Sequence, residues 1–271
     1  MDQCDPGLVG LESTYMPVWD ADQYLKFQRE RTQPAIDLAA RVRLESPRRI
    51  VDVGCGPGNS TAVLAQRFPD AELSGLDSSA EMLETARESQ PDIHWFQADI
   101  SSWEPETRYD LLFSNAVLQW VPDHATIFPR LMRFLEPEGA LAVQLPMHYD
   151  SPLHYHVKEL SALPEWYGQT AGAHEALGSE SRSFYYDLLA PLSSELELWE
   201  TEYIHVMENV EAILEWFRGT GLRPYLEALP DDEVRGRFEA VLLERYRVAY
   251  PIQKNGKVLF PFRRLFIVAY R

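Results

Sequence analysis

A glycine-rich turn at residues 54–58 constrains the fold of this chain more than any other feature of its sequence. The β-rich run at residues 50–53 ends at three alternating glycines, Gly54, Gly56 and Gly58, and a helical pattern follows them. Glycine permits the positive backbone angles of a sharp turn and lets a ligand approach the main chain. In an open α/β sheet this first crossover lies at the carboxyl edge, where ligands bind. The turn therefore predicts an α/β fold with a ligand site beside its first strand.

Strands and helices alternate along the first half of the chain. Strands are expected at 50–53, 73–76, 93–97, 111–113 and 141–145, and helices at 61–68, 80–88, 116–119 and 126–135. Later strands are expected at 196–206, 257–259 and 265–270, with helices at 210–218 and 232–249. Strands that alternate with helices in this way predict a mostly parallel sheet covered on both faces.

The chain divides into four expected parts. Residues 1–17 show no clear period and are expected to form an N-terminal extension, and 18–145 to form the ligand-binding core with a helical lid at its start. The helical pattern around Pro34 predicts two helices or one kinked helix. Residues 146–194 indicate an irregular, partly helical insert, and 195–271 hold the last strands with a helical cap at about 207–250.

Composition and charge exclude several classes of protein. The formal net charge is −17, from 42 acidic and 25 basic residues, and such a field repels nucleic acids and anionic membranes. No apolar run approaches the length of a membrane span, and no signal-peptide pattern begins the chain. The two cysteines, Cys4 and Cys55, predict neither a disulfide nor a metal site, so we expect a cytoplasmic protein. An anionic substrate then needs a local cationic pocket.

Acidic and polar side chains at successive strand ends indicate which ligand the turn binds. Asn59 stands where a dinucleotide fingerprint has its third glycine. Asp52 suits a cation, and S-adenosylmethionine carries an ammonium and a sulfonium. Asp77 is placed to hold ribose hydroxyls, Asp99 to accept from an adenine amino group, and Asn115 to line the methionine end. Each of these residues also has a plain structural interpretation as a cap, a turn former or a solvated charge.

These motifs, together with Gln119-Trp120 and the later segments 220–224 and 264–269, resemble class I S-adenosylmethionine-dependent methyltransferases. Within that class they are most similar to the enzymes that methylate trans-aconitate. The resemblance runs from about Trp19 to Arg271 and leaves residues 1–15 outside its pattern. It implies a doubly wound, mostly parallel seven-stranded sheet with S-adenosylmethionine as cofactor and S-adenosylhomocysteine as its product. The implied reaction forms a monomethyl ester on a carboxylate of trans-aconitate or a similar small polycarboxylate.

The motifs and the resemblance together give a set of cofactor residues that lie at strand ends, in the glycine turn and in the lid. They are Tyr24, Asp52, Gly54, Gly56, Gly58, Asp77, Ser78, Met82, Asp99, Ile100, Asn115 and Trp120. The expected substrate residues are Arg31, Gln119, His148, Arg223, Arg263 and Arg264.

Methyl transfer to a carboxylate makes modest demands on the protein. The acceptor is already ionised at neutral pH, so it needs placement in the line of attack rather than a general base. We therefore expect no catalytic residue beyond positioning groups, with His148 as a candidate hydrogen-bond donor. Arginines hold the remaining carboxylates best, through their bidentate fork. The spacing of His148, His154 and His156 matches no zinc motif, so no metal site is expected.

Departures from the family pattern keep other acceptors open. The run Leu145-Pro146-Met147-His148 stands where such enzymes resemble Met-Pro-Asp-Asn, and Phe262-Arg263-Arg264 stands where they resemble Phe-Pro-Arg. The insert from Tyr149 to Tyr186 also matches poorly. Alternatives are a methyltransferase for another free or carrier-linked acid, a nicotinamide-dependent oxidoreductase, and a catalytically silent binding protein. The sequence predicts no particular oligomeric state.

Overall fold

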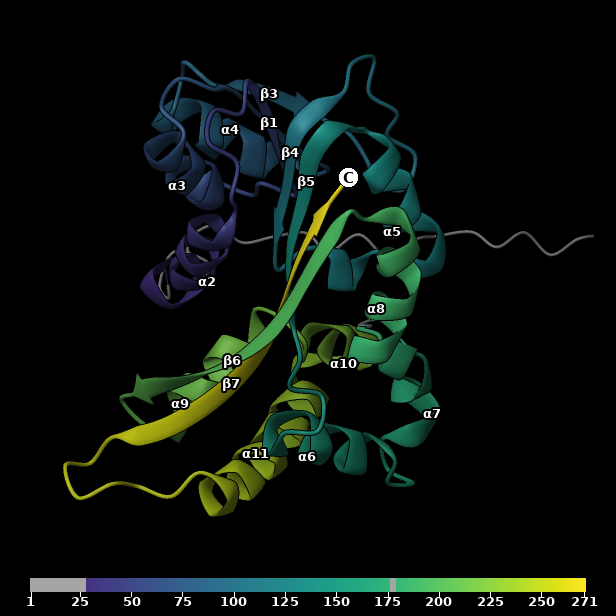
Figure 1. The fold of residues 1–271 in the computed structure, drawn as a ribbon. Coiled ribbons are helices and arrows are strands. Elements are labelled where there is room, and N and C mark those ends of the chain that lie inside the picture. The colour runs from purple at the N-terminus through teal and green to yellow at the C-terminus, as the bar shows by residue number, and fades with distance from the viewer. Residues whose placement is uncertain (1–27, 176–178) are drawn as a thin grey trace, which may run out of the picture.

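The computed structural model describes residues 28–175 and 179–271, and within these ranges the strands form one seven-stranded sheet (Figure 1). The strands are β1 (Arg49–Val53), β2 (Glu72–Asp77), β3 (His94–Gln97), β4 (Tyr109–Asn115), β5 (Leu135–Pro146), β6 (Glu195–Met207) and β7 (Val258–Tyr270). Their order is β3-β2-β1-β4-β5-β7-β6. The first five are parallel, and β7 runs antiparallel to both β5 and β6. The predicted doubly wound, mostly parallel sheet is confirmed.

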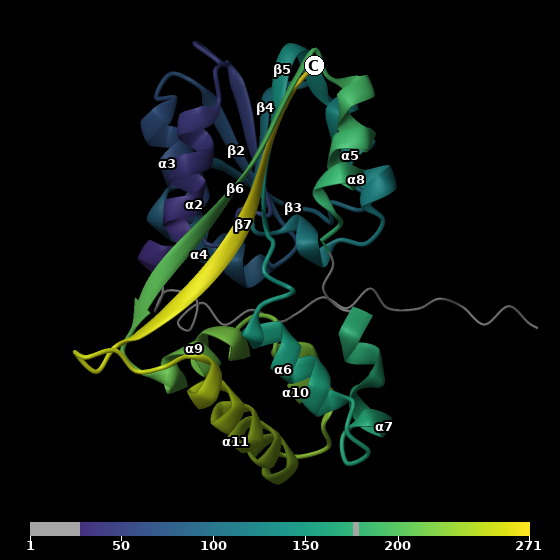
Figure 2. The same cartoon turned by 60° about the horizontal axis from the view of Figure 1, so that its bottom comes forward.

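Helices cover both faces of the sheet, because successive strand side chains point to opposite sides. On one face lie α2 (Gln28–Arg41) and α3 (Asn59–Arg67), with α4 (Ala80–Ser89) beside β2 and β3. On the other lie α5 (His124–Arg133) and α8 (Arg182–Leu189) (Figure 2). In β1, Ile50 packs in the cluster formed with α2 and α3, while the next residue, Val51, packs in the cluster formed with α5 and α8.

A second hydrophobic core lies where β6 and β7 extend beyond the rest of the sheet. Five helices surround it, α6 (Pro152–Ser161), α7 (Tyr167–Thr170), α9 (Val210–Arg218), α10 (Arg223–Ala228) and α11 (Asp232–Ala249) (Figure 2). We call these helices the cap. The rings of Trp166 and Phe238 meet edge to face at 5.2 Å in its centre. The buried Tyr246 hydroxyl donates to the Leu153 carbonyl at 2.7 Å and ties α11 to α6. The cap thus has a core of its own.

The strands expected separately at 257–259 and 265–270 are in fact one strand, β7. Pro261 makes the sequence between them look like a break, because proline lacks the N–H of a central strand. In β7, however, Pro261 pairs only with Ile204 of β6, and pairing with β5 begins at Arg264. Because the outer half of β7 has one strand partner, the missing N–H disrupts no second ladder.

Two helix predictions around β4 and β5 also need correction. The helix expected at 126–135 is α5, which ends at Arg133, and Leu135 already belongs to β5. In place of a helix at 116–119 the chain forms a turn at Ala116 and then the single 3₁₀ turn η1 (Leu118–Trp120).

The segment expected as one insert at 146–194 is divided between the two hydrophobic cores. It supplies α6, α7 and the 3₁₀ segment η2 (Ala171–Glu175) on the cap side, but α8 and η3 (Ala190–Leu192) beside the sheet.

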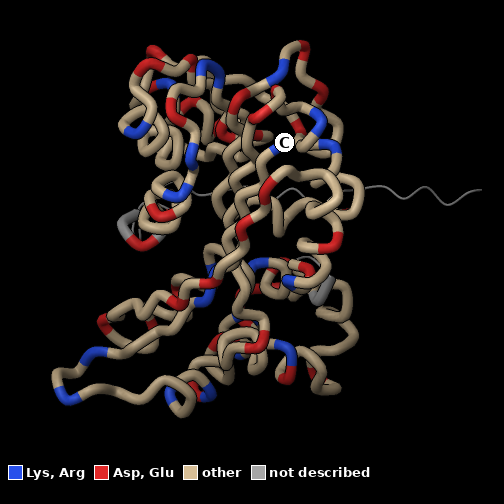
Figure 3. The backbone as a smooth tube through the Cα atoms, in the orientation of Figure 1, with Lys and Arg blue, Asp and Glu red and all other residues tan. Residues whose placement is uncertain are grey.

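Acidic and basic residues occur along the backbone of both the sheet region and the cap (Figure 3). Among the described residues, no helix has the length and apolar character needed to cross a membrane. In the same ranges, no group of three or more histidine, cysteine, aspartate or glutamate side chains is arranged to hold a metal ion.

Replacing Phe238 with alanine should destabilise the protein by about 3–5 kcal/mol, because a fully buried ring in the cap core is lost. Urea unfolding followed by circular dichroism measures this change. Val248→Ala on the same helix is the control, since Val248 is 86% exposed and its loss should change stability by less than about 0.5 kcal/mol. Equal effects of the two substitutions would contradict the assignment of this core.

Candidate active site

The glycine turn joins β1 to α3, and each of its glycines has a different reason for its place. Gly54 has a φ of 71°, and a Cβ built there would lie 2.2 Å from Val117 Cγ1. Gly58 has a φ of 91°, and its Cβ would approach the Gln90 amide nitrogen to 2.7 Å. Gly56 has a φ of 53° but no heavy atom within 4 Å of its built Cβ. Gly54 is therefore required by packing against Val117, and Gly58 by its positive φ, whereas Gly56 opens on free space.

Asp52 lies beneath this turn and is fully buried. Its Oδ2 accepts hydrogen bonds from the hydroxyls of Ser60 and Thr61, both at 2.6 Å. Its Oδ1 is buried and has no hydrogen-bond partner among the described residues. Burial raises the pKa of the Asp52 carboxyl to about 6, although the two hydroxyls oppose that rise. A buried carboxylate with one unpaired oxygen favours a nearby cation or donor.

Asp77 is the last residue of β2, and Asp99 follows β3 at the same edge of the sheet. The Asp77 carboxylate accepts from the backbone N–H of Gly56 at 2.8 Å and of Ser79 at 2.9 Å. Burial raises the pKa of Asp77, and these backbone donors partly offset the rise. Asp99 Oδ1 accepts from the N–H and the hydroxyl of Ser101. The Asp77 carboxylate is therefore held in a fixed orientation by the glycine turn and its own loop, and the Asp99 carboxylate by its own loop.

The segment after β4 is bent by Ala116, which has a φ of 58° and bonds through its N–H to the Gln144 carbonyl at 3.0 Å. A non-glycine residue in this left-handed region costs about 1–2 kcal/mol, and such strain often marks functional loops. The Gln119 amide nitrogen donates to the Ala116 carbonyl at 2.7 Å. That bond fixes the amide so that Oε1, which is buried, remains an acceptor.

His124 holds the same segment against the helices behind it. Its ring nitrogens bond to the Tyr185 hydroxyl at 2.7 Å and to the Leu118 carbonyl at 2.8 Å. The Tyr185 hydroxyl in turn accepts from the Glu180 N–H at 3.0 Å. This buried network connects η1 to α5 and α8, and it sets the position of Gln119 and Trp120.

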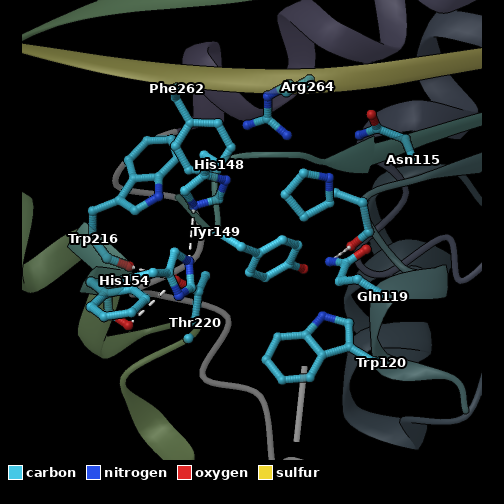
Figure 4. A pocket seen from close by; sticks show the side chains of 14 residues that line it. Asn115, Gln119, Trp120, His148, Tyr149, His154, Trp216, Thr220, Phe262 and Arg264 are labelled. Atoms are coloured by element: carbon cyan, nitrogen blue, oxygen red, sulfur yellow. Dashed lines mark hydrogen bonds between the residues drawn. The ribbon is translucent and has the colours of Figure 1, made fainter. Parts of the chain in front are cut away.

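A pocket of about 670 Å³, part of it open to solvent, lies between this sheet edge and the cap (Figure 4). Its walls come from the ends of β4 and β5, from η1, from β7 and from the cap side. The lining residues are Asn115, Ala116, Gln119, Trp120, Pro146, His148, Tyr149, His154, Trp216, Phe217, Thr220, Gly221, Phe262 and Arg264. Mostly apolar walls with a few convergent polar groups are typical of a small-molecule site.

Arg264 is the only lysine or arginine among the described residues that line this pocket. The side chain is 4% exposed, although it carries a full charge. Its Nη1 donates to Gln144 Oε1 at 3.2 Å, and its guanidinium carbon lies 4.4 Å from the centre of the Phe262 ring. Figure 4 shows the guanidinium turned toward the pocket interior. It can bind a carboxylate there.

The neighbouring Arg263 points the other way, since alternate residues of a strand face opposite sides. Its Nε donates to the Met147 carbonyl at 2.9 Å, and its guanidinium pairs with Asp150. Arg223 lies at the start of α10, where it pairs with Glu227 at 2.7 Å. Neither of these arginines is among the pocket-lining residues. The sequence alone gave no means of separating them from Arg264.

Two buried histidines meet in the pocket wall. Nε2 of His148 and Nε2 of His154 are 3.2 Å apart, and the His148 ring lies 3.8 Å from that of Phe262. Burial is the main cause that lowers both pKa values, that of His148 well below its usual 6.5 and that of His154 to about 3. The charge of Arg264 lowers the pKa of His148 further. Both rings are therefore neutral at physiological pH.

Similarity to known proteins identifies the family. Residues 50–139 match a family model described as a methyltransferase domain. A trans-aconitate 2-methyltransferase of Azoarcus sp. (strain BH72) is 51% identical over 94% of this chain and 100% of its own length. Another of Rhodopseudomonas palustris (strain BisB18) is 47% identical over 94% of this chain and 99% of its own length.

The chain belongs to the trans-aconitate 2-methyltransferase family. Solved structures support the fold at much lower identity. The YcgJ protein of Bacillus subtilis aligns with a TM-score of 0.57 at 14% identity, over 88% of this chain and 98% of that one. A Haemonchus contortus phosphoethanolamine N-methyltransferase solved with S-adenosyl-L-methionine gives a TM-score of 0.54 at 15% identity, over 88% of this chain and 52% of that one. The class I resemblance expected from the sequence is confirmed.

Apart from Arg223 and Arg263, which lie outside the pocket lining, the residues expected from the sequence fall into three groups. Asn115, Gln119, Trp120, His148 and Arg264 line the pocket. A second group lies along the carboxyl edge of β1, β2 and β3, outside that lining, and consists of Asp52, Gly54, Gly56, Gly58, Asp77, Ser78, Met82, Asp99 and Ile100. Tyr24 lies outside the described residues, as does the side chain of Arg31.

Several pocket residues were not among the expected ones. His154 and Trp216 reach the pocket from the cap, and no local motif marks them as pocket residues. Phe262 reaches it from β7 and belongs to the run Phe262-Arg263-Arg264, where only the arginines were expected to bind substrate. Thr220 and Gly221 could have been found, because the segment 220–224 stood out and its turn precedes α10. Arg223 was the residue expected from that segment, because of its charge, whereas the small residues before it line the pocket.

Asp52→Asn should stabilise the protein progressively as pH rises. The pKa of the Asp52 carboxyl is 3.8 in the unfolded chain and is raised to about 6 in the folded protein. The contribution of Asp52 to stability is therefore complete below pH 3.8 and is lost as the pH rises through about 6. Asparagine stays neutral throughout. The variant's advantage in free energy of unfolding should grow by about 1–2 kcal/mol between pH 5 and pH 8.

Urea unfolding at the two pH values measures this difference. Asp92→Asn, at an exposed position, serves as the control and should show a pH-dependent change below about 0.5 kcal/mol. If the difference in free energy of unfolding between Asp52→Asn and wild type did not change with pH, burial would not raise the pKa of Asp52.

Proposed function

We propose that this protein is an S-adenosylmethionine-dependent O-methyltransferase that forms a monomethyl ester on a carboxylate of trans-aconitate. The family membership supports the activity, and the buried Arg264 in a mostly apolar pocket supports an anionic acceptor. In a chain with a net charge of −17, a focused cationic pocket is what lets a small polycarboxylate bind. The buried arginine is the single observation that carries the choice of substrate class.

The residues at the sheet edge fit S-adenosylmethionine. Gly56 has free space where a side chain would stand, Asp52 keeps an unpaired buried oxygen, and Asp77 presents a carboxylate above the turn. Asp77 would hold the ribose hydroxyls, Asp99 the adenine end, and Asn115 with Trp120 the methionine end. When bound, the cofactor supplies an electrophilic methyl group on a sulfonium. Asn115 and Trp120 also line the pocket proposed for the acceptor, which supports binding of the two ligands next to each other.

The protein's part in the reaction is binding and orientation. Arg264 holds one carboxylate of the acceptor through its guanidinium fork. The apolar faces of Trp120, Trp216 and Phe262 exclude water around the acceptor, which strengthens its attraction to the guanidinium. A second carboxylate of the acceptor, ionised at neutral pH, then attacks the sulfonium methyl carbon without a general base. The methyl–oxygen bond forms as the methyl–sulfur bond breaks, and S-adenosylhomocysteine is the leaving group. His148 and His154 are neutral at this pH, so they add no charge to the pocket wall beside Arg264.

The alternatives from the sequence are less well supported. A nicotinamide-dependent oxidoreductase does not fit the family, whose members at 46–51% identity carry the trans-aconitate 2-methyltransferase name. A different acid remains the main competitor, because His148 occupies a pocket position where this chain departs from its relatives' pattern. Mass spectrometry of the products from S-adenosylmethionine with trans-aconitate, cis-aconitate, citrate, isocitrate and a malonyl thioester decides between them. The proposal fails if trans-aconitate yields no ester.

Arg264→Gln should raise the KM for trans-aconitate by about 10- to 100-fold, because a charge-assisted hydrogen bond to the acceptor is lost. Steady-state kinetics measures KM, and calorimetry should show cofactor affinity within about twofold of wild type. Arg263→Gln is the matched control, since Arg263 faces Asp150 outside the pocket, and it should leave KM within about threefold. If both variants behaved alike, Arg264 would have no special role in substrate binding.

Gly56→Ala and Gly54→Ala should separate cofactor binding from stability. Gly56→Ala adds a methyl group in free space, so it should cost about 1 kcal/mol of stability while weakening S-adenosylmethionine binding at least about tenfold. Gly54→Ala forces a clash with Val117 and should cost about 2–4 kcal/mol of stability. Calorimetry and thermal unfolding measure the two quantities. If Gly56→Ala bound S-adenosylmethionine with wild-type affinity, the glycine turn would not be part of the cofactor site.

A further inference from the structure

The pair formed by His148 and His154 has a chemical consequence for how the acceptor is bound. Both side chains are buried and both line the pocket, one from the segment after β5 and one from the first turn of α6. Their Nε2 atoms are 3.2 Å apart, within hydrogen-bond distance. The burial that lowers both pKa values keeps both rings neutral. In a bond between two neutral imidazoles, one Nε2 carries the proton and the other accepts it.

The direction of this bond determines what the remaining nitrogen of His148 can offer to a ligand. His148 Nδ1 is buried and has no hydrogen-bond partner among the described residues. Figure 4 shows the His148 ring in the pocket wall, joined to His154 on one side and near the guanidinium of Arg264 on the other. If His154 donates through Nε2–H, then His148 must carry its proton on Nδ1 and becomes a donor. In the opposite arrangement Nδ1 bears a lone pair and repels an anion.

We propose that His154 is a positioning residue that holds His148 as the Nδ1–H tautomer, so that His148 donates a hydrogen bond to a carboxylate oxygen of the acceptor beside Arg264. This inference rests on the proposed function, since it takes the acceptor to be a carboxylate. In this arrangement the histidine pair helps to select an acceptor that carries a carboxylate. The pocket then recognises one anion with one cation and one neutral donor.

The arrangement also explains why a histidine is suited to this position. An unpaired buried N–H is costly, and an anionic oxygen that reaches it removes that cost. Because the donor is neutral, its interaction with the acceptor adds no charge to an already desolvated wall. His154 itself packs edge to face on Phe217 at 5.0 Å, so its ring cannot turn freely away from His148. The orientation of the donor is thus fixed by packing in the cap.

The tautomer is measured directly by NMR of ¹⁵N-histidine-labelled full-length protein with S-adenosylhomocysteine and trans-aconitate bound. We expect His148 to show a protonated Nδ1 and a bare Nε2, and His154 a protonated Nε2. His148→Gln assigns the signals. The opposite tautomer of His148 would overturn the proposal, whatever the activity of the enzyme.

Kinetics of a double-mutant cycle tests the coupling. His154→Phe keeps an aromatic ring but removes the donor, and it should raise the KM for trans-aconitate about tenfold while the dissociation constant of S-adenosylhomocysteine stays within about twofold. His154→Gln, which retains an N–H donor, should recover most of that loss. In a His148→Phe background the effect of His154→Phe should disappear, because the two residues act as one unit. Additive effects of the two substitutions would overturn the proposal.

Failure of this inference is distinguishable from failure of the proposed function. If wild-type protein forms the ester but His154→Phe keeps the wild-type KM, the reaction stands and the histidine pair has no role in it. If wild-type protein binds S-adenosylmethionine but forms no ester from trans-aconitate, the proposed substrate is wrong. The inference then falls with it.

Discussion

The antiparallel pairing of β6 with β7 is the constraint on which the rest of the structure depends. It continues over thirteen residues, from Glu195 opposite Tyr270 to Met207 opposite Val258, while β5 accompanies β7 only from Arg264 onward. The outer half of this ribbon leaves the main sheet and needs an apolar cover, because a two-stranded ribbon alone is marginal in water. The cap helices provide that cover, and the pocket forms at the point where the ribbon separates from the sheet.

Arg264 lies at this point of separation. It is the first residue of β7 that pairs on both sides, with Pro146 of β5 and Thr201 of β6. A charge in such a place is costly unless it is hydrogen-bonded. The Gln144 amide oxygen accepts one of its hydrogen bonds, and the Phe262 ring packs against its guanidinium. The acidic surface therefore does not conflict with an anionic substrate, since the binding charge is local and enclosed.

The core of the fold could be predicted from the sequence because it is local in origin. Hydrophobic runs, the glycine turn and the polar strand ends follow one another within residues 49–146, and parallel strands bring their carboxyl ends to one edge. Asn115, Gln119 and Trp120 were found for that reason. The cap side was harder, since His154, Trp216 and Phe262 meet only through packing between distant segments. The two adjacent arginines of β7 look alike in sequence, and only the strand's register assigns them to opposite faces.

Pro261 hid the continuity of β7 from the sequence analysis, and its position has a further effect on the behaviour of the protein in solution. Between Val258, which also bridges Ile252, and Arg263, whose carbonyl accepts from the Met147 N–H, β7 pairs with β6 alone. The other side of this stretch offers backbone groups that a strand from another molecule could use as a template. Proline supplies no N–H there and cannot complete such a ladder. The residue that makes the strand look broken thus protects its unpaired edge against association between molecules.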